Sequence, residues 1–236
     1  MFVVEKFKVT LKEKIQETDD IITFRFVRED AKQFFFKPGQ FVTLMVDSMP
    51  DEFRKTRAYS ICSAPGSPHI DLSIKIHEQG FTKVLSNLEV GSVQTLIGPF
   101  GDFVFEPERD KKVVFIAGGI GVTPFMSMIR FIASKNLQNE AVLFFSNRTI
   151  SSIPFKAELD SIQKAHHNVR VVYVITREQV PGYECGRMTE ATIFKYINNP
   201  SEFIFYSCGP QELIQGAEQM VLKLGVPLSQ FRKEKW

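Results

Sequence analysis

The spacing of the apolar residues changes near Asp110, and this change limits the fold more than any other feature of the sequence. Before it, short segments mix apolar and polar residues with a period close to two, and turn residues separate them. After it, continuous apolar runs alternate with segments of helical period. The first pattern indicates antiparallel strands, and the second indicates βαβ units around a parallel sheet.

We therefore predict two domains, an antiparallel β-barrel or sandwich over residues 1–107 and a doubly wound α/β domain over residues 108–236. The strands expected in the first are VEKFKVTLKEKIQ, IITFRFVRED, PGQFVTLMVD, RAYSICSA, IDLSIKIHE and GSVQTLIGPFG, with one helix near residues 82–88. The second should hold the strands KKVVFIA, AVLFFSN, VRVVYVITRE and EFIFYSCGP. Its expected helices are FMSMIRFIASKN, FKAELDSIQKAH, EATIFKYIN and PQELIQGAEQMVLKLG.

The composition excludes several classes of protein. With 29 basic and 27 acidic residues the net charge is only +2, which argues against a nucleic-acid binder. The longest uncharged stretch, residues 113–129, contains three glycines and a proline and is shorter than the roughly 20 residues of a membrane span. Charges among the first apolar residues argue against a signal peptide.

The cysteines and histidines carry no metal or disulfide pattern. Cys62, Cys185 and Cys208 are widely spaced and none belongs to a CxxC motif, which favours a reducing compartment such as the cytoplasm. The four histidines lack the spacing of metal ligands, so we expect no metal site.

Two strand ends in the second half carry glycine turns. The first, GGIGVTP at residues 118–124, leads into a helix whose free amides could approach a phosphate or ribose. A plain strand–helix turn explains this motif alone equally well. The second is YSCGP at residues 206–210, where Cys208 by itself would be an ordinary buried apolar residue. Both should open at the carboxyl edge of one parallel sheet, where ligands bind.

The first half contains RAYSICS at residues 57–63 and HEQGFT at residues 77–82. Arg57 and Tyr59 share one face of a strand, where a cation and a ring could hold an anion and a planar group. Gly80 and Thr82 would open a short helix, a second place for an anion. Without further context, Arg57 and Tyr59 would be a solvated pair at a sheet edge.

Together these motifs resemble the ferredoxin–NADP(H) reductase superfamily over nearly the whole chain. They occur in the family's order as RAYSICS (57–63), GFT (80–82), GPFG (98–101), GGIGVTP (118–124) and CGP (208–210). The resemblance implies an FAD-binding antiparallel β-barrel followed by an NAD(P)-binding α/β domain.

The resemblance also implies roles for individual residues around FAD. Arg57 would hold the pyrophosphate, Tyr59 would stack on the isoalloxazine, and the Ser60 hydroxyl would bond near N5, which accepts the hydride. Other residues expected to contact FAD are Ala58 in the same motif, Gly80, Phe81 and Thr82 at the pyrophosphate, and Lys75, Ile76 and His77 near the ribityl chain.

On the nucleotide side, the resemblance implies that Gly119, Gly121 and Thr123 meet the pyridine nucleotide. Cys208 would lie beside the nicotinamide C4 atom as a catalytic residue, within the turn that Gly209 and Pro210 complete. Thr176 and Arg177 resemble a pair that binds the 2′-phosphate of NADPH, and Ser146 and Arg148 could reach the adenosine half.

We expect no acidic residue at these strand ends to hold a free 2′-hydroxyl, which favours NADPH slightly over NADH. A surface arginine is the other interpretation, so the expected co-substrate remains NADPH or NADH.

The last residues, Glu234-Lys235-Trp236, resemble the ending of family members in which an acidic residue precedes an aromatic that covers the flavin. Glu234 would then be catalytic and Trp236 would cover the flavin or its adenine. A frayed terminus is an equally good interpretation.

The predicted function is hydride transfer from NAD(P)H to bound FAD, followed by release of single electrons. The chain lacks a CxxxxCxxC cluster for a plant-type [2Fe–2S] centre, so we expect a stand-alone module with a separate partner. That partner would be a ferredoxin, a flavodoxin or an oxygenase component. Two alternatives stay open, a reductase of free flavin and a non-catalytic flavin-binding subunit.

Overall fold

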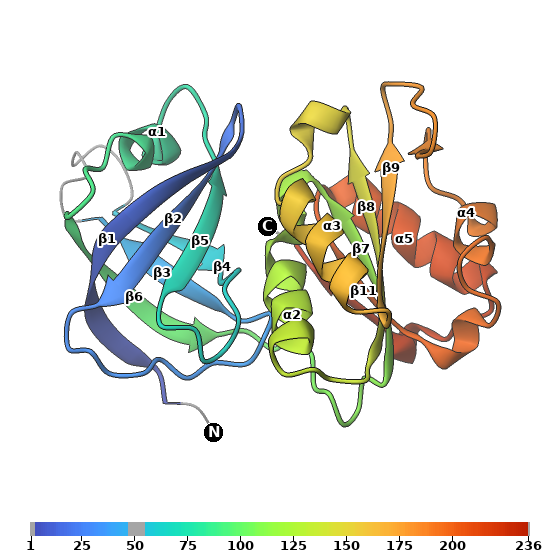
Figure 1. Ribbon diagram of the computed structural model, residues 1–236, viewed down its shortest axis with the longest axis horizontal. Coiled ribbons are helices and arrows are strands. Elements are labelled where there is room, and N and C mark those ends of the chain that lie inside the picture. The colour runs from blue at the N-terminus through green and yellow to red at the C-terminus, as the bar shows by residue number, and fades with distance from the viewer. Residues whose placement is uncertain (1–2, 47–54, 236) are drawn as a thin grey trace. The chain divides into compact units, whose positions relative to one another are not determined.

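The computed structural model describes residues 3–46 and 55–235, which form two compact units (Figure 1). The first unit runs to Val104 and also includes the segment Thr123–Phe131. The second comprises Phe105–Val122 and the chain from Ile132 onward. The sequence predicts a domain boundary after residue 107, whereas the packing divides the chain at Val104 and assigns part of one helix to the first unit.

The first unit is built on a six-stranded antiparallel sheet in the order β4-β3-β6-β1-β2-β5. Its two edges meet just beyond β4, where the Cys62 amide donates to the Asp71 carbonyl at 2.9 Å. This hydrogen bond closes the sheet into the expected barrel. The strands are β1 (Glu5–Thr18), β2 (Ile21–Arg28), β3 (Phe41–Met45), β4 (Thr56–Ser60), β5 (Ile70–Lys75) and β6 (Val93–Phe100), and α1 spans Phe81–Ser86.

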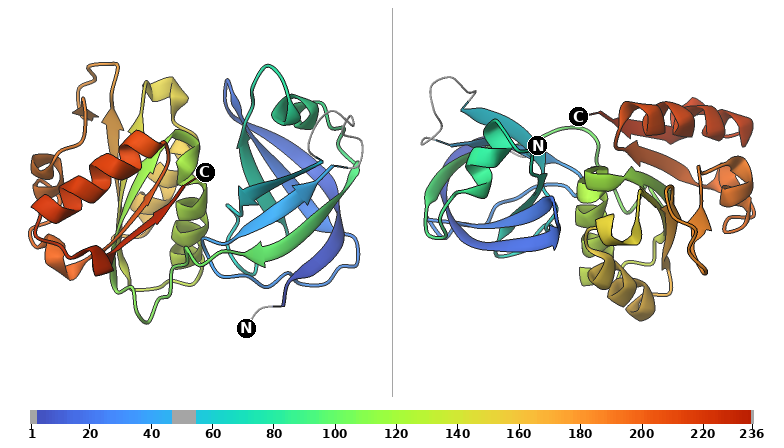
Figure 2. Two further views of the ribbon diagram at one scale, coloured as in Figure 1. Left: turned by 180° about the vertical axis from the view of Figure 1, so that it is seen from behind. Right: turned by 90° about the horizontal axis from the view of Figure 1, so that it is seen from above.

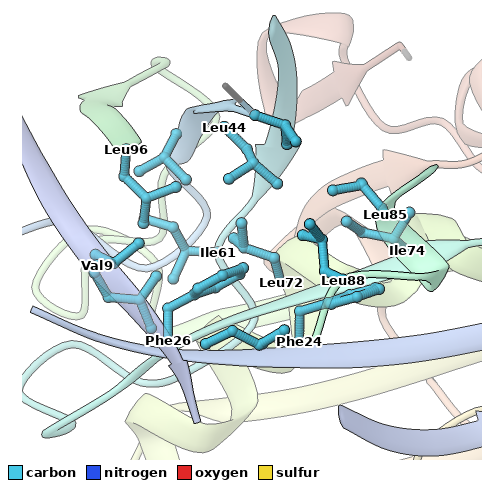
Figure 3. Close-up of a cluster of buried hydrophobic side chains, with 14 of the residues drawn as sticks. Val9, Phe24, Phe26, Leu44, Ile61, Leu72, Ile74, Leu85, Leu88 and Leu96 are labelled. Carbon is cyan, nitrogen blue, oxygen red and sulfur yellow. The ribbon is translucent and has the colours of Figure 1, made fainter. Parts of the chain in front are cut away.

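Alternate residues of these strands fill the inside of the barrel. In β2, Phe24 and Phe26 are both fully buried and point into the same cluster as Leu85 of α1 (Figure 3). Strand periodicity sends every second side chain inward, so the aromatic residues of this half are largely core residues.

The second unit is a six-stranded parallel sheet in the order β10-β9-β8-β7-β11-β12, with α3 and α5 on opposite faces (Figure 2). The chain starts at β7 in the middle, proceeds outward to β10, and returns to β11 on the other side of β7. The strands are β7 (Lys112–Gly118), β8 (Glu140–Asn147), β9 (Val169–Ile175), β10 (Glu184–Cys185), β11 (Ile204–Cys208) and β12 (Phe231–Glu234). The α-helices are α2 (Thr123–Ser134), α3 (Lys156–Ala165), α4 (Glu190–Phe194) and α5 (Gln211–Lys223), and 3₁₀ turns η1–η4 lie at Gly119–Val122, Ile150–Ser152, Pro200–Glu202 and Leu228–Gln230.

The two outermost strands of this sheet are not predicted by the local sequence pattern. β10 has two residues, and β12, Phe-Arg-Lys-Glu, has no run of apolar residues. Each gains its strand conformation by pairing with a longer neighbour, a tertiary effect that local pattern does not contain. Within the described residues, no helix combines the length and apolarity that a membrane crossing requires.

A buried carboxylate fixes β12 to the start of the second unit. Asp110 is fully buried and accepts hydrogen bonds from the Arg109 guanidinium at 2.8 Å and from the Tyr206 hydroxyl at 2.8 Å. Arg232 of β12 donates to the same carboxylate at 3.1 Å and also bonds the Tyr206 hydroxyl. Burial alone would raise the pKa of Asp110, but hydrogen bonds from Arg109, the Glu106 amide, Tyr206 and Arg232 outweigh it and hold the pKa below its ordinary value.

We expect Asp110→Asn to lower the free energy of unfolding by about 1–3 kcal/mol, because it takes the anionic acceptor from the buried Tyr206 hydroxyl and from the partly exposed guanidinium of Arg232. The contribution of Asp110 is present above its ordinary pKa of 3.8 and is lost as the pH falls through the lower folded value. Chemical unfolding followed by circular dichroism between pH 3 and pH 7 measures both effects. Glu108→Gln is the control, since its carboxylate is 96% exposed and its ion pair with Lys111 should add little. Equal losses in the two variants would contradict this assignment.

Candidate functional site

The end of β4 carries the first group of expected site residues. β4 is an edge strand, and among the described strands only β3 pairs along it. Arg57 and Ala58 are exposed, Tyr59 is half-buried and Ser60 is buried. The Arg57 guanidinium lies 5.6 Å from the centre of the Phe81 ring, and the Tyr59 ring lies 6.4 Å from the same ring. Residues 57–60 and the start of α1 are therefore brought together.

Two hydroxyl groups on this strand are buried without a hydrogen-bond partner, the Tyr59 Oη and the Ser60 Oγ. Burial raises the pKa of the Tyr59 phenol, so the group stays protonated. A buried hydroxyl without a partner costs free energy, and natural proteins rarely leave one unless a ligand or water completes it. Two such groups on adjacent residues indicate a polar ligand at this edge.

The turn before α1 provides space for a ligand. Gly80 has φ +78°, a conformation that favours glycine, and a Cβ built there would meet no atom within 4 Å. The Thr82 hydroxyl accepts a hydrogen bond from the His77 amide at 3.0 Å, and this bond fixes the conformation of the turn. This open turn, next to the Arg57 cation on the Phe81 ring, fits a phosphate-bearing ligand.

The expected ribityl contacts are less clearly placed. Lys75 is exposed and its ammonium forms an ion pair with Asp20 at 2.7 Å. The side chain of Ile76 packs against the barrel core, and His77 is exposed. A flavin contact of these three residues stays a prediction.

In the second unit, the ends of β7 and β11 interlock. A Cβ on Gly121 would lie 2.5 Å from the Cys208 carbonyl oxygen and 2.6 Å from Gly209 Cα. Gly209, with φ +150°, lies against the backbone of Gly118. The two glycine turns are thus packed backbone to backbone at the carboxyl edge, where the strand order reverses and open α/β sheets bind ligands.

Next to this contact, the turn after β7 has open space at Gly119. A Cβ at Gly119 would meet nothing within 4 Å, so this backbone is free to be approached. Cys208 is fully buried at the end of β11, Pro210 is exposed, and Thr123 is 6% exposed at the start of α2. The structure thereby brings Gly119, Gly121, Cys208, Gly209 and Pro210 together at one sheet edge.

The neighbouring strand ends carry two exposed arginines side by side. The Arg177 amide donates to the Arg148 carbonyl at 2.9 Å, and the exposed Thr176 donates to the Asn147 carbonyl through both its amide and its hydroxyl. Ser146 is half-buried at the end of β8.

That no acidic residue at these strand ends is ready to hold a free 2′-hydroxyl stays a prediction. The Glu178 carboxylate accepts a hydrogen bond from the Ile150 amide at 3.0 Å, since the chain after β9 continues beside the chain after β8. The co-substrate, NADPH or NADH, therefore stays open.

Glu234 is held in register opposite Cys208 by the pairing of β12 with β11. Its Oε2 atom is buried with no hydrogen-bond partner, and burial raises its pKa to about 7. Trp236 lies outside the described residues. The frayed-terminus interpretation therefore does not hold as far as Glu234.

Sequence reasoning missed one further polar group at this edge. Asn147, 6% exposed, is the last residue of β8, and its Nδ2 atom is buried without a partner. An asparagine directly after a buried apolar run is the signal that could have identified it. Its amide, like the Ser207 hydroxyl of β11, is a buried donor of the second unit that no described acceptor satisfies.

Comparisons with known proteins agree with this arrangement. A family model described as "Oxidoreductase FAD-binding domain" matches residues 8–105, and one described as "Oxidoreductase NAD-binding domain" matches residues 115–219. The glycine betaine monooxygenase reductase subunit of Chromohalobacter salexigens is 32% identical over 93% of this chain and 61% of its own length. Ferredoxin–NADP reductase B of Sorangium cellulosum is 29% identical over 89% of both chains.

The fold is also similar to that of solved structures. The flavohem-like FAD/NAD-binding domain of nitric oxide dioxygenase from Vibrio cholerae aligns over 98% of both chains, with a TM-score of 0.87 and 22% identity. The present chain spans less than two thirds of the length of the monooxygenase reductase subunit named above.

We expect Gly121→Ala to destabilise the protein by about 1–3 kcal/mol or more, because the new methyl group would overlap the backbone of residues 208 and 209. Gly216→Ala is the matched control. Gly216 lies inside α5 with open space at the Cβ position, so alanine should stabilise the helix by up to about 1 kcal/mol. Thermal unfolding distinguishes the two, and a neutral Gly121→Ala would contradict the close backbone contact.

We expect the Glu234 carboxyl to titrate near pH 7. Its folded pKa lies above the ordinary value of 4.5, so its stabilising contribution is full below pH 4.5 and is lost as the pH rises through about 7. A carbon-13 NMR titration, with the resonance assigned by its loss in Glu234→Gln, measures the midpoint. A midpoint near 4.5 would show that the group is solvated.

Proposed function

Since the chain belongs to the ferredoxin–NADP(H) reductase superfamily, we propose that it is an FAD-dependent oxidoreductase that takes a hydride from NADPH or NADH and passes single electrons to a separate protein. The observation that carries the proposal is the pair of buried, unpartnered hydroxyls of Tyr59 and Ser60 on the edge strand β4. They stand within the RAYS sequence, where the family binds its flavin.

The residues of the first unit fit FAD. Arg57 offers a permanent cation for the pyrophosphate, and the open turn at Gly80 lets that group approach the backbone. The Tyr59 ring, half-buried beside Phe81, offers a flat surface for the isoalloxazine. When bound, FAD supplies the chemistry of accepting two electrons together and releasing them one at a time.

Ser60 has the most direct part in this proposal. Its hydroxyl, buried and without a protein partner, would donate a hydrogen bond near flavin N5 and orient the ring for hydride arrival. Buried surroundings would exclude water from that bond and so strengthen it.

The second unit would hold the nucleotide. The turn at Gly119 gives backbone access, Thr123 would meet the nicotinamide end, and Cys208 would bound the nicotinamide C4 position. Glu234, paired in register with Cys208, would supply a protonatable group at the same strand end. Arg148, Arg177 and Glu178 would meet the adenosine half, with cations suited to a 2′-phosphate and a carboxylate suited to a free 2′-hydroxyl.

The electron acceptor we propose is a small redox protein or an oxygenase component. A relative of 32% identity is named as a monooxygenase reductase subunit, and another is named as a ferredoxin–NADP reductase. We place the protein in the cytoplasm, which agrees with the absence of a disulfide among Cys62, Cys185 and Cys208.

Anaerobic stopped-flow spectroscopy tests the proposal. The purified protein should retain FAD, and its visible flavin absorption should bleach on mixing with NADPH or NADH. The nucleotide that bleaches it faster identifies the preferred co-substrate. Ser60→Ala should bind FAD but bleach about 10- to 100-fold more slowly, and Ser67→Ala, on a half-buried loop residue, should behave like the wild type.

Two outcomes would contradict the proposal. A protein that is isolated without flavin, and that does not retain added FAD, would instead use free flavin as a substrate. A protein that retains FAD which neither nucleotide bleaches would be a non-catalytic flavin-binding subunit.

A further inference from the structure

We propose that Ser127 and Arg130 of α2 are positioning residues for hydride transfer, because they hold the start of this helix against the backbone that follows Ser60. The inference rests on the proposed function. It adds residues that lie outside the motifs of the sequence.

Two hydrogen bonds make the connection. The Ser127 hydroxyl donates to the Ser63 carbonyl at 2.8 Å, and the Arg130 guanidinium donates to the Cys62 carbonyl at 2.7 Å. Ser127 is fully buried and Ser63 is 2% exposed, so water does not compete for the first bond. All four residues belong to the first compact unit.

The connection reaches Thr123 through the geometry of the helix. Thr123, Ser127 and Arg130 are spaced four and three residues apart, so they lie along one face of α2. Thr123 is 6% exposed, one turn before Ser127. The face that carries the proposed nicotinamide contact is therefore the face that is bonded to Cys62 and Ser63.

At the other end, the bonds join the segment that carries Ser60. Cys62 and Ser63 follow Ser60 by two and three residues, and the Cys62 amide donates to the Asp71 carbonyl of β5 at 2.9 Å. The Ile61 amide likewise donates to the Gln40 carbonyl at 3.0 Å. This short segment is held on both sides, so it forms a rigid base for the helix.

A buried acidic residue adds to the rigidity of the base. Asp71 is 1% exposed and forms two hydrogen bonds with the Arg25 guanidinium, at 3.0 and 3.1 Å. The Arg130 guanidinium lies 4.0 Å from the same carboxylate, and the Ser63 hydroxyl accepts a hydrogen bond from the Asp71 amide at 3.1 Å. Arg130 is thus oriented by a charge as well as by the Cys62 carbonyl.

The consequence concerns rate more than affinity. Hydride transfer requires the donor C4 and the acceptor N5 within near-attack distance, and a displacement of about 1 Å can cost a factor of about 100. Residues that fix Thr123 relative to Ser60 should act on the transfer step, and binding of each cofactor should depend on its own contacts.

The test compares the rate constant of flavin reduction at saturating nucleotide with the nucleotide dissociation constant, both from anaerobic stopped flow. In Ser127→Ala and Arg130→Met we expect the rate constant to fall about 10- to 100-fold. The dissociation constant and the FAD content should stay within about a factor of two of the wild type. Arg130→Lys, which keeps a cationic donor, should recover part of the rate.

Hydrogen exchange of the isolated holoprotein gives a readout independent of activity. The amides of residues 125–131 and 61–63 should exchange faster in Ser127→Ala than in the wild type. The matched controls are Ser161→Ala on α3 and Arg170→Met on β9, both exposed, and they should change neither rate nor exchange.

Three outcomes overturn the proposal, and they differ from one another. If the wild type is reduced and the variants are reduced equally fast, the positioning role is wrong and the proposed function stands. Loss of FAD, or a rate that falls only because nucleotide affinity falls, would show a structural or binding role. If neither nucleotide reduces the wild type, the proposed function itself fails and this inference fails with it.

Discussion

The close backbone contact between the ends of β7 and β11 is the constraint on which the arrangement of the second unit depends. Gly121 and Gly209 leave out side chains so that two strand ends can touch, and this contact sets where Cys208, Pro210 and the open turn at Gly119 lie. β12 then pairs with β11, and the buried Asp110 network holds it there. The positions of the polar groups at this edge are therefore set by the packing of the main chain.

Buried polar atoms without a partner are concentrated at the candidate site, although Gln94 Oε1 and Ser207 Oγ also lack a partner among the described residues. Elsewhere, buried polar groups such as Asp71 and Asp110 receive several hydrogen bonds each. At the strand ends, the Tyr59, Ser60, Asn147 and Glu234 side chains each keep a buried atom without a partner. Such groups cost about 1–3 kcal/mol each when nothing completes them, so a bound ligand would recover stability as well as gain affinity.

Sequence reasoning recovers the fold and much of the candidate site, because those features are local. Period-two segments, apolar runs and glycine turns are each readable over a few residues, and they predicted both sheets and the motifs at their edges. The pairing of β12 and the hydrogen bond between Glu178 and the Ile150 amide depend on which distant segments become neighbours. The bonds of Ser127 and Arg130 are hidden for the same reason, since their positions look like an ordinary helix surface until the helix is placed.

The division of α2 between the two compact units has a consequence for domain recombination in such proteins. A nucleotide-binding half transplanted from a relative at a junction near residue 107 would carry its own version of α2 onto a foreign barrel. The residues at positions 127 and 130 of the transplanted helix would then have to hydrogen-bond to the carbonyls of residues 62 and 63 of a different protein. The unit that can be exchanged without loss is therefore larger than the nucleotide-binding domain alone. Recombination between relatives should be tolerated only where α2 and the barrel segment that it contacts are compatible.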